Sequence, residues 1–169
     1  MAVRDRQTFP SLLQVDAILG RLKGSAALAE VCRFLRHEFS HYRWVGIYRL
    51  EGAVLLLDGW DGEAPTEHAR IPIERGICGQ AVREGRTVIV DDVHAAPEYL
   101  ACFLETRSEI VVPIREGDRI VGEIDIDGHE VRAYDASDRE FLEAVAAKLA
   151  RSVREAAAAA TPIAPDPTS

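Results

Sequence analysis

The first forty residues place apolar side chains at helical spacing. Residues 11–22 and 26–39 each carry apolar side chains three and four positions apart, which marks one face of an α-helix. Gly24 and Ser25 separate the two segments, and serine is a residue type that commonly caps a helix N-terminus. The pattern therefore predicts two amphipathic helices at the start of the chain, with Ser25 capping the second.

The middle of the chain changes to short apolar runs that are typical of β-strands. Residues 43–50 and 53–58 are rich in Val, Ile, Leu and aromatic residues, and Glu51 with Gly52 between them predicts a tight hairpin. Further strands are predicted over 69–73, 86–93, 108–114 and 119–127, and the last two form a long terminal hairpin. Loops are predicted over 59–68 and 94–106, the second holding a short helix.

Two more helices complete the pattern. Residues 74–85 predict a turn that leads into one or two helical turns ending at Gly85, and Asp135 predicts the N-cap of a final helix that runs to about Ala160. Hairpin-linked strands with helices at both ends are typical of an α+β domain. The sequence thus predicts a central antiparallel sheet of about six strands flanked by N- and C-terminal helices.

Length and composition indicate one domain. The chain has 169 residues, of which 47% are hydrophobic, and this is enough for one packed core. We expect residues 1–160 to form a single domain and residues 161–169 to form a disordered C-terminal tail.

Charge and hydropathy argue against two classes of partner. The formal net charge is -8, and Lys and Arg are dispersed among acids, whereas nucleic-acid binding needs a basic face. No apolar run reaches the roughly 18 residues of a membrane helix, and the first residues lack an apolar stretch of signal-peptide length. We therefore expect no nucleic-acid partner, no membrane segment and a cytoplasmic location.

Three cysteines, an odd number, argue against a framework of structural disulfides in a reducing compartment. Cys32 lies on the apolar stripe of the second helix, which indicates a core residue. Cys78 starts a predicted helix, where backbone N–H groups and the helix dipole favour a thiolate, and Cys102 lies in a long loop, where reactive groups are common. The residues alone leave a second interpretation open for Cys78 and Cys102, as small buried side chains.

The predicted strand over 119–127 carries three acids on one face. Side chains alternate along a strand, so Glu123, Asp125 and Asp127 point to the same side. Glu109, early in the preceding strand, lies where it could join them across the hairpin. Two interpretations stay open: a solvated face, or a carboxylate cluster that binds an ammonium group or, with one pKa raised by its neighbours, donates a proton.

Two aromatic residues and two histidines complete the candidates. Trp44 and Tyr48 are four positions apart on one strand, so they form either ordinary core packing or an aromatic wall for an apolar or sulfur-containing group. His68 and His94 lie near the cysteines in the sequence, but the chain has no C-x-x-C pair. We therefore expect no metal site, and no motif indicates a cofactor.

Five segments resemble, in order and spacing, the GAF domains of the free methionine-(R)-sulfoxide reductases. The segments are HYRWVGIYRL, RIPIERGICGQAV, DDVHAAPEYLAC, SEIVVPI and IVGEIDIDG. The resemblance covers roughly residues 25–150. It implies a GAF-like fold, a homodimer, and reduction of free methionine-(R)-sulfoxide to methionine.

The resemblance also implies roles for the cysteines. Cys102 corresponds to the thiolate that attacks the sulfoxide sulfur, releases the thioether and becomes a sulfenic acid. Cys78 corresponds to a resolving or supporting thiol, and thioredoxin would reduce the resulting disulfide.

The same resemblance implies the substrate contacts. Glu109, Asp125 and Asp127 are expected around the ammonium and sulfoxide groups, and Trp44 and Tyr48 against the methyl end. One carboxyl must stay neutral near pH 7, because the sulfoxide oxygen needs a proton to leave as water.

The sequence departs from the family pattern at two places. The family commonly has another cysteine just before its R-I-P strand, where this chain has His68 or Ala69. The small polar stretch that usually follows the attacking cysteine is replaced by residues 103–107, FLETR. An alternative function is therefore a non-catalytic GAF sensor that binds a small metabolite, with Cys102 as a redox switch.

Overall fold

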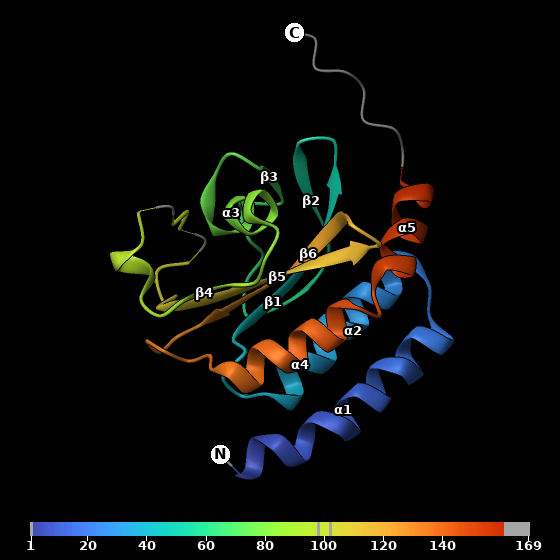
Figure 1. Cartoon of the computed structure of the whole chain (residues 1–169), viewed down its shortest axis with the longest axis horizontal. Helices are drawn as coiled ribbons and strands as arrows, with labels where there is room; N and C mark the ends of the chain where they lie inside the picture. Colours follow the sequence, from blue (N-terminus) through green and yellow to red (C-terminus); the bar gives the residue numbers. More distant parts are fainter. Residues whose placement is uncertain (1, 98, 102, 161–169) are drawn as a thin grey trace, which may run out of the picture.

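The computed structural model describes residues 2–97, 99–101 and 103–160, with side chains from Thr8 onward. In this part of the chain, six strands form one antiparallel sheet in the order β3-β2-β1-β6-β5-β4 (Figure 1). The strands are β1 (Trp44–Glu51), β2 (Val54–Asp61), β3 (Arg70–Pro72), β4 (Val88–Val90), β5 (Ser108–Glu116) and β6 (Arg119–Gly128). The predicted α+β sheet of about six strands with helices at both ends is confirmed.

Helices cover the two faces of the sheet unequally (Figure 1). One face carries α1 (Ala2–Arg21), α2 (Gly24–Glu38), α4 (Ala136–Ala146) and α5 (Ala150–Ala159). The other face carries α3 (Gly76–Glu84) and the short 3-10 helix η1 (Val93–Ala95). Helix α2 packs directly on β1 and β2, and α1 rests on α2 and α4. None of the helices in the described residues is both long and apolar enough to cross a bilayer.

The larger hydrophobic core lies between the sheet and the four-helix layer. Alternate residues of the central strands point into it, as the period of a strand requires. The sheet supplies Val45, Ile47, Ile110, Val112, Ile124 and Ile126. The helices supply Leu28, Val31, Leu35, Phe141, Leu142 and Leu149.

The opposite face of the sheet carries a smaller apolar cluster. Its buried members include Trp44, Tyr48, Ile77, Cys78 and Val111. Ala96, Tyr99 and Phe103 of the segment after β4 pack against it from outside. The described residues of the loop predicted over 94–106 therefore cover this second face.

The start of α2 differs from the sequence prediction. The helix begins at Gly24, its N-cap is Lys23, and Ser25 lies inside the first turn without capping it. The backbone N–H of Gly24 instead donates to a carboxylate oxygen of Glu155 on α5, over 3.0 Å. A carboxylate at a helix N-terminus satisfies the free N–H groups and opposes the helix dipole. A partner distant in the sequence thus replaces the local cap.

The final helix is interrupted, although the pattern predicts one continuous helix. Asp135 caps its start through a capping box with Asp138, as expected. Residues 147–149 then form a turn, in which the N–H groups of Lys148 and Leu149 bond three residues back. Leu149 is fully buried at this turn, so packing redirects the chain where no Gly or Pro signals a break. Strand β2 likewise continues to Asp61, into residues predicted as loop.

Candidate functional site

Four acidic side chains lie together on the sheet face opposite the four-helix layer, and we term them the acidic cluster. Their exposed fractions are 5% for Glu109, 0% for Glu123, 1% for Asp125 and 2% for Asp127. Three come from β6 by strand alternation, and Glu109 joins them because it pairs with Asp127 across the β5–β6 hairpin. Of the two interpretations left open by the sequence, the solvated face is therefore wrong.

Burial keeps protons on the acidic cluster. It raises the pKa of Asp125 from 3.8 to about 6, although hydrogen bonds with Glu109 and Cys78 oppose the shift. Burial also raises the pKa of Glu109 and of Asp127 well above their ordinary values, and the charge of Asp125 adds to both shifts. Burial therefore favours the protonated form of these carboxyls, which is the condition for a carboxyl that acts as a proton donor.

The acidic cluster has no positive partner in the described part of the chain. No Lys, Arg or His side chain there forms an ion pair with any of its four members. Both carboxylate oxygens of Glu123, Oδ1 of Asp125 and Oδ2 of Asp127 lack a hydrogen-bond donor among the described residues. Buried carboxylates normally have partners, so these oxygens are free to accept a positively charged group from outside the described residues.

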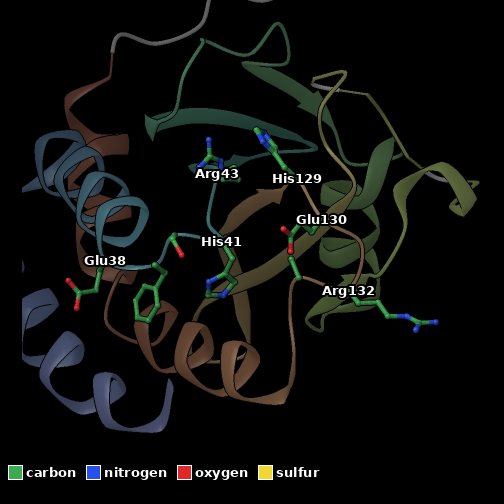
Figure 2. Close-up of a pocket in the computed structure, with 9 residues that line it drawn as sticks. Glu38, His41, Arg43, His129, Glu130 and Arg132 are labelled. Carbon is green, nitrogen blue, oxygen red and sulfur yellow. The ribbon is translucent and has the colours of Figure 1, made fainter. Parts of the chain in front are cut away.

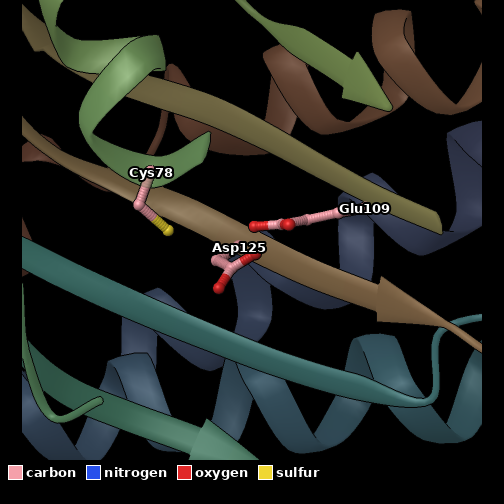
Figure 3. A group of neighbouring side chains, drawn as sticks. All are labelled: Cys78, Glu109 and Asp125. Carbon is pink, nitrogen blue, oxygen red and sulfur yellow. The ribbon is translucent and has the colours of Figure 1, made fainter. Parts of the chain in front are cut away.

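Cys78, the third residue of α3, points at the acidic cluster. Its Sγ and one carboxylate oxygen each of Glu109 and Asp125 all lie within 4.8 Å of one another (Figure 3). Gly79 lets the start of α3 pack tightly on the residue that follows β3, because a Cβ there would lie 2.3 Å from the carbonyl oxygen of Ile73.

The prediction that the helix start favours a thiolate at Cys78 is wrong. Burial, followed by the charges of Asp125, Glu123 and Glu109, raises the pKa of the Cys78 thiol well above its ordinary value. The partial charge at a helix N-terminus is outweighed by desolvation and by neighbours of the same sign as a thiolate.

Two aromatic side chains of β1 line the acidic cluster. Trp44 lies opposite Asp127 and Tyr48 lies opposite Glu123 in the β1–β6 register, so all four side chains share one face. Both rings are buried. The structure therefore brings the two predicted aromatic residues beside the predicted acids.

Glycines make room for the Trp44 indole. A Cβ at Gly46 would lie 2.4 Å from the Trp44 ring, and a Cβ at Gly62 would lie 2.1 Å from it. The ring can therefore lie across β1 next to Asp125, the register partner of Gly46. The ring centroid of Phe103 is 5.9 Å from that of Trp44, so the loop closes on the aromatic wall.

The segment on either side of Cys102 covers this site. Leu100 lies over the first turn of α3, since a Cβ at Gly76 would be 3.2 Å from the Leu100 Cβ. Phe103 packs on Trp44 from the other side. The candidate attacking thiol, Cys102, lies outside the described residues.

His68 ties this covering segment to β1. Its Nε2–H donates to the carbonyl oxygen of Ala101 over 2.9 Å. The Tyr48 hydroxyl in turn donates to the carbonyl oxygen of His68 over 3.0 Å. His68 therefore contacts the residue directly before Cys102.

The model of the GAF domain family matches residues 24–154 of this chain. The chain belongs to the GAF domain family. It is similar to GAF domain-containing protein A of Dictyostelium discoideum, with 34% identity over 133 residues that cover 78% of this chain and 82% of the relative. It is also similar to the free methionine-R-sulfoxide reductase of Escherichia coli strain K12, with 32% identity over 124 residues that cover 73% of this chain and 74% of the relative.

A solved structure extends this likeness. The X-ray structure of free methionine-R-sulfoxide reductase from Neisseria meningitidis in complex with its substrate has a TM-score of 0.81 and 33% identity, and covers 90% of this chain and 92% of that chain. The resemblance to the GAF domains of free methionine-(R)-sulfoxide reductases, which five sequence segments indicated, is therefore confirmed.

Two neighbouring surface hollows border the edge of the site at Arg43 and His129, and no member of the acidic cluster lines either of them. A cavity of 150 Å³ borders Trp44 and Phe103 and is also lined by Arg43 and His129. A larger groove of 560 Å³ shares Arg43 and His129 with it and continues along the end of α2, with Glu38 and Arg132 at its two sides (Figure 2). Of these two hollows, the smaller one borders Trp44 of the aromatic wall.

Sequence reasoning missed three contributors to the site of this GAF domain. Glu123 was recognised on the acidic face but not as a buried neighbour of Cys78, because only the fold brings α3 over β6. Gly46 could have been found, since a glycine between two aromatic residues in a strand signals a close approach. The contact of His68 with Ala101 has no sequence signal, as 33 residues separate the two.

Proposed function

We propose that this GAF domain reduces free methionine-(R)-sulfoxide to methionine through a cysteine sulfenic acid. The observation that carries the proposal is the buried acidic cluster without a positive partner, set beside an aromatic wall in a chain similar to free methionine-R-sulfoxide reductases. Free methionine sulfoxide fits both parts of the site. Its ammonium group can pair with the carboxylates, and its sulfur-containing methyl end can pack against the rings.

The acidic cluster would divide two tasks. Asp125, with a pKa of about 6, is ionised near pH 7 and holds the substrate ammonium. Glu109 and Asp127, whose pKa values burial also raises, would share a proton and donate it to the sulfoxide oxygen. Trp44 and Tyr48 contact the methyl end and exclude water from it.

Cys102 would carry the redox step. Its thiolate attacks the sulfoxide sulfur, a carboxyl supplies one proton, and the products are the thioether and Cys102 sulfenic acid. The sulfoxide sulfur gains two electrons and the cysteine sulfur loses two. The contacts of Leu100, Ala101 and Phe103 support this role, since they hold the flanking residues over the acidic cluster.

Cys78 would then act as the resolving thiol. Its sulfur attacks the sulfenic acid, a disulfide forms, and water leaves. A carboxylate that has just lost its proton to the sulfoxide is beside Cys78, accepts the thiol proton and passes it to the leaving hydroxyl oxygen, so that water forms. This transfer compensates for the raised pKa of the buried thiol. A dithiol such as thioredoxin reduces the disulfide and restores both cysteines.

His68 would be a positioning residue in this scheme. It is one of the two residues, His68 and Ala69, that stand where the family commonly has its additional cysteine, and it holds the backbone before Cys102 by a hydrogen bond. Substituting His68 by Ala should raise KM more than it lowers kcat, because the covering segment loses a fixed contact while the reacting groups remain.

We also propose that the protein works in the cytoplasm as a homodimer. Phe9 and Leu13 on the outer surface of α1 are 69% and 53% exposed, which supports an interface formed by the opening helix. Light scattering on the wild type and on Leu13→Glu tests this, and a monomeric wild type would rule it out.

The test of activity separates the reductase from the alternative, a sensor of a small metabolite. Purified protein is incubated with free methionine-(R)-sulfoxide and dithiothreitol, and methionine is quantified, with the (S)-epimer and a peptide-bound sulfoxide as controls. Turnover of the free (R)-epimer alone is expected. Cys102→Ser should abolish turnover, whereas Cys78→Ser should retain one reduction equivalent and lose thioredoxin-dependent recycling. Tight binding of the sulfoxide without turnover by the wild type would establish the sensor instead.

A further inference from the structure

We propose that Cys78, Glu109 and Asp125 form a binding site for a thiophilic divalent cation, with Zn²⁺ as the best-fitting ion. The thiol sulfur and the two carboxylate oxygens lie within 4.8 Å of one another and come from α3, β5 and β6 (Figure 3). One sulfur and two oxygens from three side chains leave a fourth position open, as in zinc sites that keep room for an external ligand.

Buried carboxylate oxygens around the three donors favour a bound cation, independently of the distances between the donor atoms. Oδ1 of Asp125 and both oxygens of the neighbouring Glu123 are buried without a hydrogen-bond donor among the described residues. Glu123 lies two positions before Asp125 on the same face of β6, where it can supply a further oxygen ligand. A divalent ion at this point would satisfy these oxygens and remove the repulsion between like charges.

The donor set selects the kind of cation. A thiolate favours Zn²⁺ and other soft or borderline ions over Mg²⁺ and Ca²⁺, which prefer oxygen ligands alone. On binding, the metal–sulfur bond replaces the S–H bond of Cys78, the thiol proton is released, and a carboxyl ligand that holds a proton must release it as well. The three donors must also draw together, since zinc–sulfur and zinc–oxygen bonds are about 2.3 and 2.0–2.2 Å long.

The sequence predicted no metal site, because zinc motifs are usually recognised by two ligands a few residues apart. Here 31 and 47 positions separate Cys78 from Glu109 and from Asp125, by their residue numbers. Strand register and the position of α3, rather than a local motif, bring the donors together.

The site overlaps the place proposed for the substrate ammonium. Zn²⁺ should therefore inhibit sulfoxide reduction in competition with the substrate, and a chelator should restore activity. This consequence rests on the proposed function, whereas binding of the ion does not.

Binding is tested with Co²⁺ as a spectroscopic probe and Zn²⁺ as its competitor. The titration uses Cys102→Ser protein, so that Cys78 and Cys32 are the remaining thiols. We expect a thiolate-to-cobalt charge-transfer band that Zn²⁺ abolishes. Adding Cys78→Ser should remove the band, and adding Glu109→Gln should weaken Zn²⁺ binding about 10- to 100-fold in calorimetry. The matched control, Cys32→Ser, changes a buried cysteine of the other core and should leave the band intact.

Each outcome decides the proposal. A band that is missing, or that survives Cys78→Ser in a protein with native circular dichroism, overturns the site. Loss of binding in Glu109→Gln supports it even if Cys78→Ser fails to fold. Zinc binding in a protein that reduces no sulfoxide would keep the metal site and reject the proposed function, so the two failures are distinguishable.

Discussion

The two faces of β6 carry opposite chemistry on one strand. Ile124 and Ile126 point into the core beneath the four helices, and Glu123, Asp125 and Asp127 point the other way. Both sets are buried to a similar degree. On the helix face, burial removes apolar surface from water and stabilises the fold.

On the acidic face, the same degree of burial costs stability, because carboxyls lose hydration without gaining positive partners from the described chain. Burial alone therefore does not show that a residue belongs to the stabilising hydrophobic core. The helix-side core contributes enough stability to offset the cost of burying the acids on the other face, which is organised for a ligand.

The largest expected effect separates the two faces by activity. Glu109→Gln or Asp125→Asn should lower kcat/KM for free methionine-(R)-sulfoxide roughly 1000-fold, or about 4 kcal/mol, because the ammonium partner or the proton donor is lost. Steady-state kinetics measures the change. The control Glu140→Gln alters an exposed acid on the helix side and should retain wild-type kinetics. Unchanged kinetics in both site variants would remove the acidic cluster from the mechanism.

The next effect concerns stability on the helix face. Ile126→Ala should lower the free energy of unfolding by about 3 kcal/mol, since it opens a cavity in the main core. Chemical denaturation measures the loss. The folded fraction of the variant should still bind substrate, because the side chain points away from the acidic cluster. A loss of less than about 0.5 kcal/mol would contradict the distinction between the faces.

On the acidic face, removing a buried charge should raise the free energy of unfolding rather than lower it, and the effect is smaller. Raising the pKa of Asp125 from 3.8 to about 6 costs up to about 3 kcal/mol once the group ionises. Because the folded state binds the proton more tightly, this contribution makes stability fall as pH rises from about 4 to about 6, after which it stays constant. Asp125→Asn should therefore be about 1–2 kcal/mol more stable than the wild type at pH 7. Denaturation of both proteins at about pH 4 and at pH 7 measures the difference. Equal stability of variant and wild type at pH 7, with the wild type insensitive to pH, would refute the cost assigned to this group.

The smallest effect is expected at Cys32. Its thiol lies in the helix-side core and contacts the carbonyl oxygen of Gly59 at 3.5 Å. Cys32→Ser should lower stability by about 1 kcal/mol, because a hydroxyl is buried less favourably than a thiol, and it should leave kinetics unchanged. Reduced turnover per folded molecule would show that this cysteine takes part in the redox chemistry.

The sequence was most informative where a pattern repeats. The alternation along β6 identified which residues share a face, and the Gly52 hairpin and the Gly85 helix end lie where predicted. Whether the acidic face is exposed to solvent or buried depends on α3 and on the loop after β4, which are distant from β6 in the sequence. For the same reason the cap from Glu155 and the turn at Leu149 were not predicted, since both arise from tertiary packing.

The strand order has a consequence for how the molecule folds. The strands β1, β2 and β3 adjoin one another, as do β4, β5 and β6, and the two halves of the sheet meet only where β1 pairs with β6. That pairing joins Trp44 to Asp127, across more than eighty intervening residues, so loop-closure entropy opposes it until much of the chain has collapsed. The aromatic wall belongs to the early half and the acids to the late half. During synthesis, therefore, neither half would bind ligand alone, and the unpaired edges of β1 and β6 would be the surfaces at risk of aggregation until they meet.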